Sequence, residues 1–368
     1  MYIRQMDKIR NPEEIGVFQT VNDPERVAGG GGDLKVARKT LFHAYDHIIS
    51  PENLLLAWQE FLRGKKNKAD VTEFKLKLMD NILDLHNDLK NKTYTHDNYS
   101  AFKVNDPKPR DIHKASVRDR VLHRAIYRIL YPFFDKKFIF DSYSCRLEKG
   151  THKALVRFQD FSKRVSFNHT KNVWILKGDI KKCFASIDQA ILFEILKKSI
   201  KDIDVLILLK TIIKSFSSGV VYKGLPLGNL TSQLFINIYL NEFDQFVKHK
   251  LKAKYYIRYA DDFVFFSQDR GELENMVAII SEFLMEKLKL TIHPKKLFIK
   301  TLASGVDFLG WIHFSYHRVL RTSTKWRMFR RLEESQKEET VQSYFGMLGY
   351  GDGWKLQEKV KSMLILQK

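Results

Sequence analysis

The sequence predicts an α+β fold, and three observations indicate it. Residues 254–267 and 306–322 each contain apolar strands joined by a short turn, which is typical of antiparallel pairing. The segment 172–180, NVWILKGDI, is apolar enough for a buried strand. Stretches with helical periodicity lie between these strands. Because the strands form tight strand–turn–strand units, an antiparallel α+β arrangement fits better than a doubly wound parallel sheet.

Several further elements are expected along the chain. The glycine run at 29–32 marks the end of a polar, loosely structured extension over 1–32. Ser186 and Gln189 have the spacing of a capping box at the start of a helix. The remaining apolar patterns predict helices over 33–90, 116–131, 186–200, 231–251 and 272–290, a strand over 291–299, and a basic helical region over 323–368.

The charge balance restricts the class of partner. Lys and Arg total 63 against 43 Asp and Glu, so the net charge is +20 in a chain that is 44% hydrophobic. Such a chain folds, and its surplus of positive charge favours a polyanionic partner, most often nucleic acid and less often an anionic membrane. A basic surface without a dedicated partner stays open at this point.

The cysteines and the apolar runs indicate the cellular compartment of the protein. Cys145 and Cys183 are the two cysteines, and neither has the spacing of a zinc site or a disulfide framework. The N-terminus lacks the apolar core of a signal peptide, and the longest apolar run, 204–213, is too short to cross a bilayer. We therefore expect a cytoplasmic protein without a membrane partner.

Three aspartates suggest the chemistry. Asp179 ends the strand WILKGD, and Asp261 and Asp262 stand together in the hairpin 254–267. Adjacent carboxylates repel each other, but carboxylate oxygens are ligands that Mg²⁺ prefers. Two such ions, with Mn²⁺ as the alternative metal, can support a phosphoryl or nucleotidyl displacement. A solvated surface turn is the alternative interpretation; the flanking apolar strands and Asp179 favour the metal site.

These motifs resemble those of reverse transcriptases. YADD at 259–262 resembles that family's Tyr-x-Asp-Asp motif, KGDIKKCFASID at 177–188 resembles its first catalytic motif, and GLPLGNLTSQ at 224–233 resembles the motif beneath the incoming nucleotide. The resemblance extends from about residue 53 to residue 354. It implies a right-hand polymerase with fingers and palm over 33–315 and a short helical thumb over 316–368. It also implies that Asp179, Asp261 and Asp262 are the catalytic residues and bind two Mg²⁺ ions.

The resemblance assigns further roles residue by residue. Phe184 would lie under the sugar and exclude a 2′-hydroxyl, and Lys296 would stand near the leaving pyrophosphate. A core position for Phe184 and a surface position for Lys296 are the structural alternatives. The expected nucleotide-binding residues are Arg110, Phe184, Leu227, Gln233 and Lys296, and the expected primer and template contacts are Tyr259, Gly228, Gly310, Arg327 and Arg330.

Within the family, the chain is most similar to polymerases of diversity-generating retroelements. Intron and retroviral enzymes usually have a proline at the position of Gln233 and a glutamine at the position of Leu227. The resemblance implies error-prone copying of an RNA template into cDNA, with errors at template adenines. An aliphatic Leu227 would remove a polar contact to the nucleotide, which is a physical reason for lax selection; simple packing of Leu227 is the alternative.

The expected partners follow from this resemblance. They are an RNA template, a DNA or RNA primer, deoxynucleotides, a structured non-coding RNA and a small basic accessory protein. A reverse transcriptase of an antiphage defence system, using its own non-coding RNA, is the alternative function. A non-catalytic RNA-binding scaffold and an RNA-dependent RNA polymerase are two further hypotheses; the three carboxylates oppose the first and Phe184 opposes the second.

Overall fold

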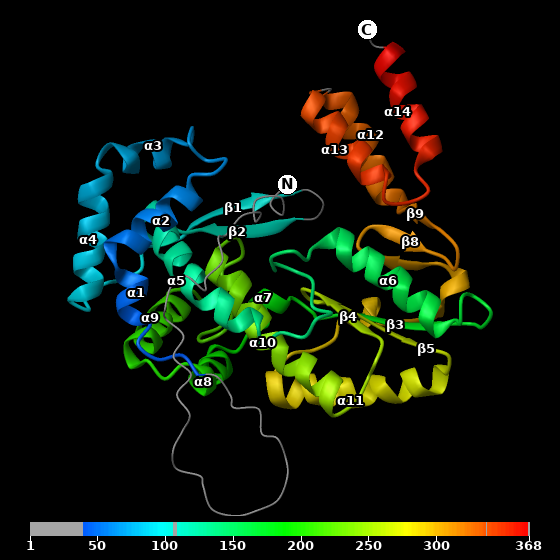
Figure 1. Ribbon diagram of the computed structural model, residues 1–368, viewed down its shortest axis with the longest axis horizontal. Coiled ribbons are helices and arrows are strands. Elements are labelled where there is room, and N and C mark those ends of the chain that lie inside the picture. Colours follow the sequence, from blue (N-terminus) through cyan, green and yellow to red (C-terminus); the bar gives the residue numbers. More distant parts are fainter. Residues whose placement is uncertain (1–39, 106–108, 336, 367–368) are drawn as a thin grey trace, which may run out of the picture. The chain divides into compact units, whose positions relative to one another are not determined.

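The computed structural model describes residues 40–105, 109–335 and 337–366, so the predicted extension over 1–32 lies outside the described residues. The chain forms two compact units, which we describe separately (Figure 1). The first unit contains the described residues up to Ile139 together with Lys181–Gln245 and Leu284–Leu290. The second contains Phe140–Ile180, Phe246–Phe283 and the chain from Thr291 onward.

The first unit is mainly helical. Ser50 caps α2 by accepting a hydrogen bond from the Asn53 amide, and Ser116 caps α5 through the amide of Asp119. The predicted helix 116–131 is confirmed. It ends four residues later than predicted, at Asp135, and contains Pro132. The elements of this unit are α1 (Tyr45–Ile49), α2 (Pro51–Phe61), α3 (Ala69–Leu76), α4 (Leu78–Lys90), β1 (Ser100–Val104), β2 (Arg110–Lys114), α5 (Val117–Asp135), α7 (Cys183–Ser186), α8 (Gln189–Ser199) and α9 (Ile203–Lys214).

The start of α8 differs from the prediction. The capping box of Ser186 and Gln189 is wrong, because Ser186 ends the short helix α7. Asp188 caps α8 instead, and its carboxylate accepts from the amides of Ala190 at 3.0 Å and Ile191 at 3.1 Å. A carboxylate at this position also suits the positive end of the helix dipole.

The second unit is built on a four-stranded antiparallel sheet in the order β4-β5-β3-β6. Its strands are β3 (Trp174–Asp179), β4 (Tyr256–Tyr259), β5 (Asp262–Ser267) and β6 (Phe298–Thr301). The helix α6 (Thr151–Val165) packs on β4 and β5, with Phe158 and Phe161 against Phe266 (Figure 1). These aromatic contacts pack α6 against the strands that carry the hairpin residues 261 and 262.

The predicted strand over 291–299 is only partly correct. Pro294 starts a turn of 3₁₀ helix, η2 (Pro294–Lys296), and the strand β6 begins only at Phe298. Proline cannot donate a ladder hydrogen bond, which explains the delay.

The rest of the second unit contains a smaller sheet and three helices. The sheet has the order β7-β8-β9, with β7 (Val306–Phe308), β8 (Trp311–His313) and β9 (Arg318–Leu320). The helices α12 (Thr322–Glu334), α13 (Glu338–Leu348) and α14 (Trp354–Leu366) follow, as the basic helical pattern predicted. The helices α10 (Leu230–His249) and α11 (Arg270–Leu288) each contribute residues to both units.

The predicted α+β class is therefore confirmed, with every strand pair of the three sheets antiparallel. Among the described residues, no helix combines the length and the hydropathy needed to cross a bilayer.

Candidate active site

The pairing of β3 with β5 brings two of the three predicted carboxylates together. Asp179 and Asp262 are direct Cα partners across the two strands, each at the end of its strand. Asp261 precedes Asp262 in the two-residue turn between β4 and β5, and its carbonyl accepts from the amide of Ile180 at 3.1 Å. Asp179, Asp261 and Asp262 thus lie at one end of the sheet of the second unit.

A buried arginine supports this turn. Arg258 is fully buried in β4, donates from Nη1 to the Ala260 carbonyl at 3.0 Å and from Nη2 to Ser142 Oγ at 3.1 Å. Ala260 has a left-handed φ of 54°, a conformation that is unfavourable for a residue with a Cβ. The hydrogen bond from Arg258 to the Ala260 carbonyl therefore stabilises the turn that presents Asp261.

The carboxylates destabilise one another's charged forms. Burial, together with Asp262 and Asp179, raises the pKa of Asp261 to about 6. Burial also raises the pKa of Asp262, against the opposing effect of Lys177. The negative charge at this end of the sheet is therefore only partly compensated by the protein itself.

Two lysines provide that partial compensation. Lys296 Nζ lies 2.7 Å from Asp179 Oδ2, and Lys177 Nζ lies 3.7 Å from Asp262 Oδ1. Asp179 itself is buried, whereas the Lys296 side chain is 41% exposed. The structure thus brings the predicted nucleotide-binding residue Lys296 to the carboxylates.

The carboxylates at this end of the sheet are chemically suited to a divalent metal ion. In the described parts of the chain, no group of three His, Cys, Asp or Glu side chains is already arranged to hold an ion. The chemistry of the donors nevertheless fits Mg²⁺, because hard carboxylate oxygens with raised pKa values gain from a nearby cation. A cation bound through Asp179 Oδ2 would compete with Lys296, which donates to that oxygen at 2.7 Å.

The expected primer and template contacts of the second unit lie on β4, in the turn between β7 and β8, and on α12. Tyr259 is the Cα partner of Asp262, and its hydroxyl lies 3.0 Å from Thr151 Oγ1. Gly310, with a φ of 85°, forms the tight turn between β7 and β8, where its carbonyl accepts from the Arg321 amide. Arg327 is half-buried on α12, and the exposed Arg330 lies 3.8 Å from Glu334.

The remaining expected nucleotide contacts belong to the first unit. The Leu227 carbonyl accepts from the His113 amide of β2 at 3.0 Å, and Leu227 is half-buried. Gly228 has a φ of 109°, and a Cβ there would lie 2.8 Å from Ile112 Cγ2. The loop before α10 is thus held against β2, the strand that begins at the exposed Arg110.

Phe184 and Gln233 flank the same loop. The Phe184 carbonyl accepts from the Leu225 amide at 2.8 Å, and its ring is half-buried rather than part of the core. Gln233 is half-buried in the first turn of α10. The first unit therefore collects Arg110, Phe184, Leu227, Gly228 and Gln233 around β2 and the loop 224–229.

Three residues of the site had no role in the sequence-based prediction. They are Arg258, which holds the turn, Lys177, which faces Asp262, and Thr151, which contacts Tyr259. Arg258 and Lys177 carried a usable signal, because a cation inside an otherwise apolar strand requires a buried partner. Thr151 carried none, since it is distant in sequence from the hairpin.

Comparison with known proteins agrees with these motifs. Residues 103–313 match the family model described as "Reverse transcriptase (RNA-dependent DNA polymerase)". Protein YkfC of Escherichia coli K12 is 26% identical over 265 residues, covering 61% of this chain and 66% of YkfC. The group II intron-encoded protein LtrA of Lactococcus lactis is 30% identical over 158 residues, covering 42% of this chain and 25% of LtrA.

A telomerase structure from Candida albicans aligns with a TM-score of 0.47 at 12% identity, covering 63% of this chain and 48% of the other. The chain thus spans about two thirds of YkfC and a quarter of LtrA.

Proposed function

The chain belongs to the reverse transcriptase (RNA-dependent DNA polymerase) family, and from this premise we propose that it copies an RNA template into DNA. The primer 3′-oxygen attacks the α-phosphate of a deoxynucleotide, and pyrophosphate leaves. The observation that carries the proposal is the direct pairing of Asp179 with Asp262 across β3 and β5, with Asp261 in the adjoining turn.

We propose that Asp179, Asp261 and Asp262 hold two Mg²⁺ ions, with Mn²⁺ as an alternative. Mg²⁺ held by these carboxylates would neutralise phosphate charge and activate the attacking oxygen. The chain's own contribution is positioning. Arg258 orients the turn with Asp261, and Lys296, which contacts Asp179, would donate a proton to the leaving group; that contact supports the proposal.

We propose nucleotide contacts for residues of the first unit, and primer and template contacts for residues of the second. In the first unit, Arg110 binds the triphosphate, Phe184 excludes a 2′-hydroxyl, and Leu227, Gly228 and Gln233 border the base. In the second unit, Tyr259 and Gly310 contact the primer end, and Arg327 and Arg330 follow the template–primer backbone. The half-buried Phe184 ring and the exposed Arg110 support these assignments, because neither is absorbed by the core.

Primer extension on a defined RNA template tests the activity. The full chain is given Mg²⁺ with either deoxynucleotides or ribonucleotides, beside Asp261→Asn and the control Asp80→Asn, an exposed residue of α4. We expect deoxynucleotide products from the wild type and the control, and none from Asp261→Asn. Equal extension by Asp261→Asn would disprove the assignment of the carboxylates, and ribonucleotide products would favour an RNA polymerase.

We further propose that the copying is error-prone, as in a diversity-generating retroelement. The half-buried aliphatic Leu227, beside the positive-φ Gly228, supports this proposal because it offers no polar contact to a base. Sequenced products should carry errors opposite template adenine, and Leu227→Gln should reduce them, whereas Leu227→Met should not. Faithful cDNA from the wild type would instead favour the defence-system function.

We propose the partners of this activity from the resemblance to the reverse transcriptase family. They are an RNA template, a DNA or RNA primer, deoxynucleotides, a structured non-coding RNA and a small basic accessory protein. Among the described residues, neither Cys145 nor Cys183 forms a disulfide, which suits the reducing cytoplasm that we propose as the location.

A further inference from the structure

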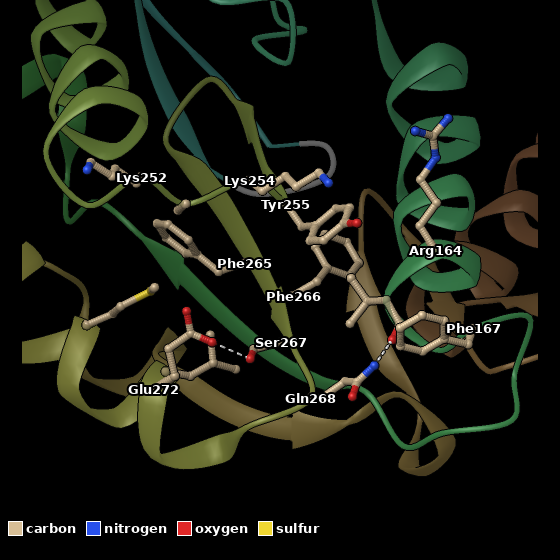
Figure 2. A pocket seen from close by; sticks show the side chains of 14 residues that line it. Arg164, Phe167, Lys252, Lys254, Tyr255, Phe265, Phe266, Ser267, Gln268 and Glu272 are labelled. Carbon is tan, nitrogen blue, oxygen red and sulfur yellow. Dashed lines mark hydrogen bonds between the residues drawn. The ribbon is translucent and has the colours of Figure 1, made fainter.

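A second feature of the palm-like sheet is a cavity away from the carboxylates. It has a volume of about 320 Å³ and lies where β5 ends at Ser267 and β4 begins. Phe265, Phe266 and Ser267 of β5 line the cavity, whereas Asp262 starts this strand three residues before Phe265, about 10 Å away along the strand. Figure 2 shows Arg164 and Phe167 on one side of the cavity and Lys252 and Lys254 on another. We call it the Phe167 pocket; its main lining residues are Arg164, Phe167, Lys252, Lys254, Tyr255 and Gln268.

The Phe167 pocket is positively charged. Arg164, Lys252 and Lys254 line it, and all three are exposed, whereas Glu272 is the one carboxylate among its lining residues. Glu272 already accepts a hydrogen bond from Ser267 (Figure 2). Arg164 donates a hydrogen bond from Nε to Asp160 Oδ1 at 2.9 Å, which leaves its other guanidinium nitrogens for a ligand. This charge distribution favours an anionic partner.

Phe167 gives the pocket an exposed aromatic face. The Phe167 side chain is 61% exposed, and the backbone of Phe167, Asn168 and His169 has φ values of 51°, 58° and 69°. A run of left-handed residues is costly, and a bulky aromatic residue rarely adopts this conformation. Hydrogen bonds from the Asn168 amide to the Lys163 carbonyl and from the His169 amide to Ser166 Oγ, both 2.8 Å, hold the loop. The fold thus maintains a strained loop that presents an aromatic ring to solvent.

We propose that the Phe167 pocket binds a single-stranded segment of nucleic acid, with a base on the Phe167 ring and phosphates against Lys252, Lys254 and Arg164. Cations beside exposed aromatic rings are the combination that binds single strands without sequence preference. Because the pocket and the carboxylates lie at opposite ends of β5, this site is additional to the one where the primer is extended. It would anchor an RNA or a DNA strand on the second unit while synthesis proceeds.

Photocrosslinking to the full chain tests the site directly. A short single-stranded RNA with one 4-thiouridine, and a DNA of the same sequence with 4-thiothymidine, are irradiated with the protein without primer or nucleotides, and the crosslinked peptides are mapped. We expect crosslinks within 163–172 and 252–256. Crosslinks with RNA alone would identify a template or non-coding RNA as the source, and equal crosslinks with DNA would identify single-stranded DNA as well. Crosslinks confined to other segments would overturn the proposal.

Two variants and one control make the test quantitative. Phe167→Asn should abolish the crosslink at this site, while the thermal midpoint stays unchanged or rises because Asn tolerates a left-handed φ. Lys252→Ala/Lys254→Ala should weaken oligonucleotide binding by roughly ten-fold and lower the salt dependence by about 1.4, the value for two phosphate contacts. The control Lys197→Ala/Lys201→Ala, on exposed lysines of the first unit, removes the same charge and should leave both unchanged.

The two proposals fail in different ways. Because the crosslinking reaction contains no primer or deoxynucleotide, a chain without polymerase activity still reports on the pocket, and Asp261→Asn should crosslink like the wild type. If Lys252→Ala/Lys254→Ala binds as tightly as its control, the pocket is not a nucleic-acid site, whatever the outcome of primer extension.

Discussion

Gly178 lies one residue before Asp179, and its replacement by alanine provides a stringent test of how the carboxylates are positioned. Gly178 and Phe263 are Cα partners across β3 and β5, and Phe263 is fully buried. A Cβ on Gly178 would lie 2.1, 2.5 and 2.9 Å from three atoms of the Phe263 ring. Because ordinary carbon contacts are about 3.5–4.0 Å, the ring or the strand has to move by roughly 1.5 Å.

The expected cost of Gly178→Ala follows from this overlap. Overpacking a buried site typically costs about 1–3 kcal/mol, and we expect the upper end because three ring atoms are involved. If the strands separate instead, Asp179 moves away from Asp262, and a misplacement of about 1 Å is enough to slow a reaction by roughly 100-fold. Urea denaturation and primer extension measure the two effects.

A double-mutant cycle isolates the contact. In the Phe263→Leu background the ring is absent, so Gly178→Ala should cost at least about 1 kcal/mol less than in the wild type. The control is Gly349→Ala, because a Cβ on Gly349 meets no atom closer than 3.7 Å. If Gly178→Ala unfolds at the same urea concentration as the wild type, or if its cost is additive with Phe263→Leu, the steric argument is refuted.

Three further predictions concern buried or paired side chains. Arg258→Met removes the hydrogen bonds to Ala260 and Ser142 and should lower the free energy of unfolding by about 1–3 kcal/mol, together with the rate of primer extension; a variant as stable and active as the wild type would contradict this role. Lys296→Met should slow extension by roughly 100-fold while Mg²⁺ activation shifts to lower concentration, because the ammonium no longer occupies Asp179; an unchanged Mg²⁺ dependence would argue against that competition. Burial, then His96 and Arg120, lowers the pKa of His123 from 6.5 to about 3, so the unfolded chain binds more protons below pH 6.5 and stability falls as the pH is lowered. His123→Leu should therefore remove ~2 kcal/mol of the stability lost between pH 7 and pH 5, as urea denaturation at both pH values would show.

The sequence by itself determined the class of fold, the family, and which three carboxylates the strand pairing brings together. Apolar strands joined by two-residue turns are local patterns, and so is the sequence YADD between them, so both could be predicted without tertiary contacts. The local cap of α8 was predicted wrongly, because Ser186 and Asp188 compete for the same role and the end of α7 decided between them.

Only the tertiary structure decided how the site is held together. The contacts of Lys296 with Asp179, of Lys177 with Asp262 and of Arg258 with Ser142 depend on strand register and on segments up to 117 residues apart. The Phe167 pocket likewise requires the end of α6, the start of β4 and the end of β5 to meet. Such contacts depend on the packing of distant segments, and no periodicity within a single segment encodes which cation will face which carboxylate.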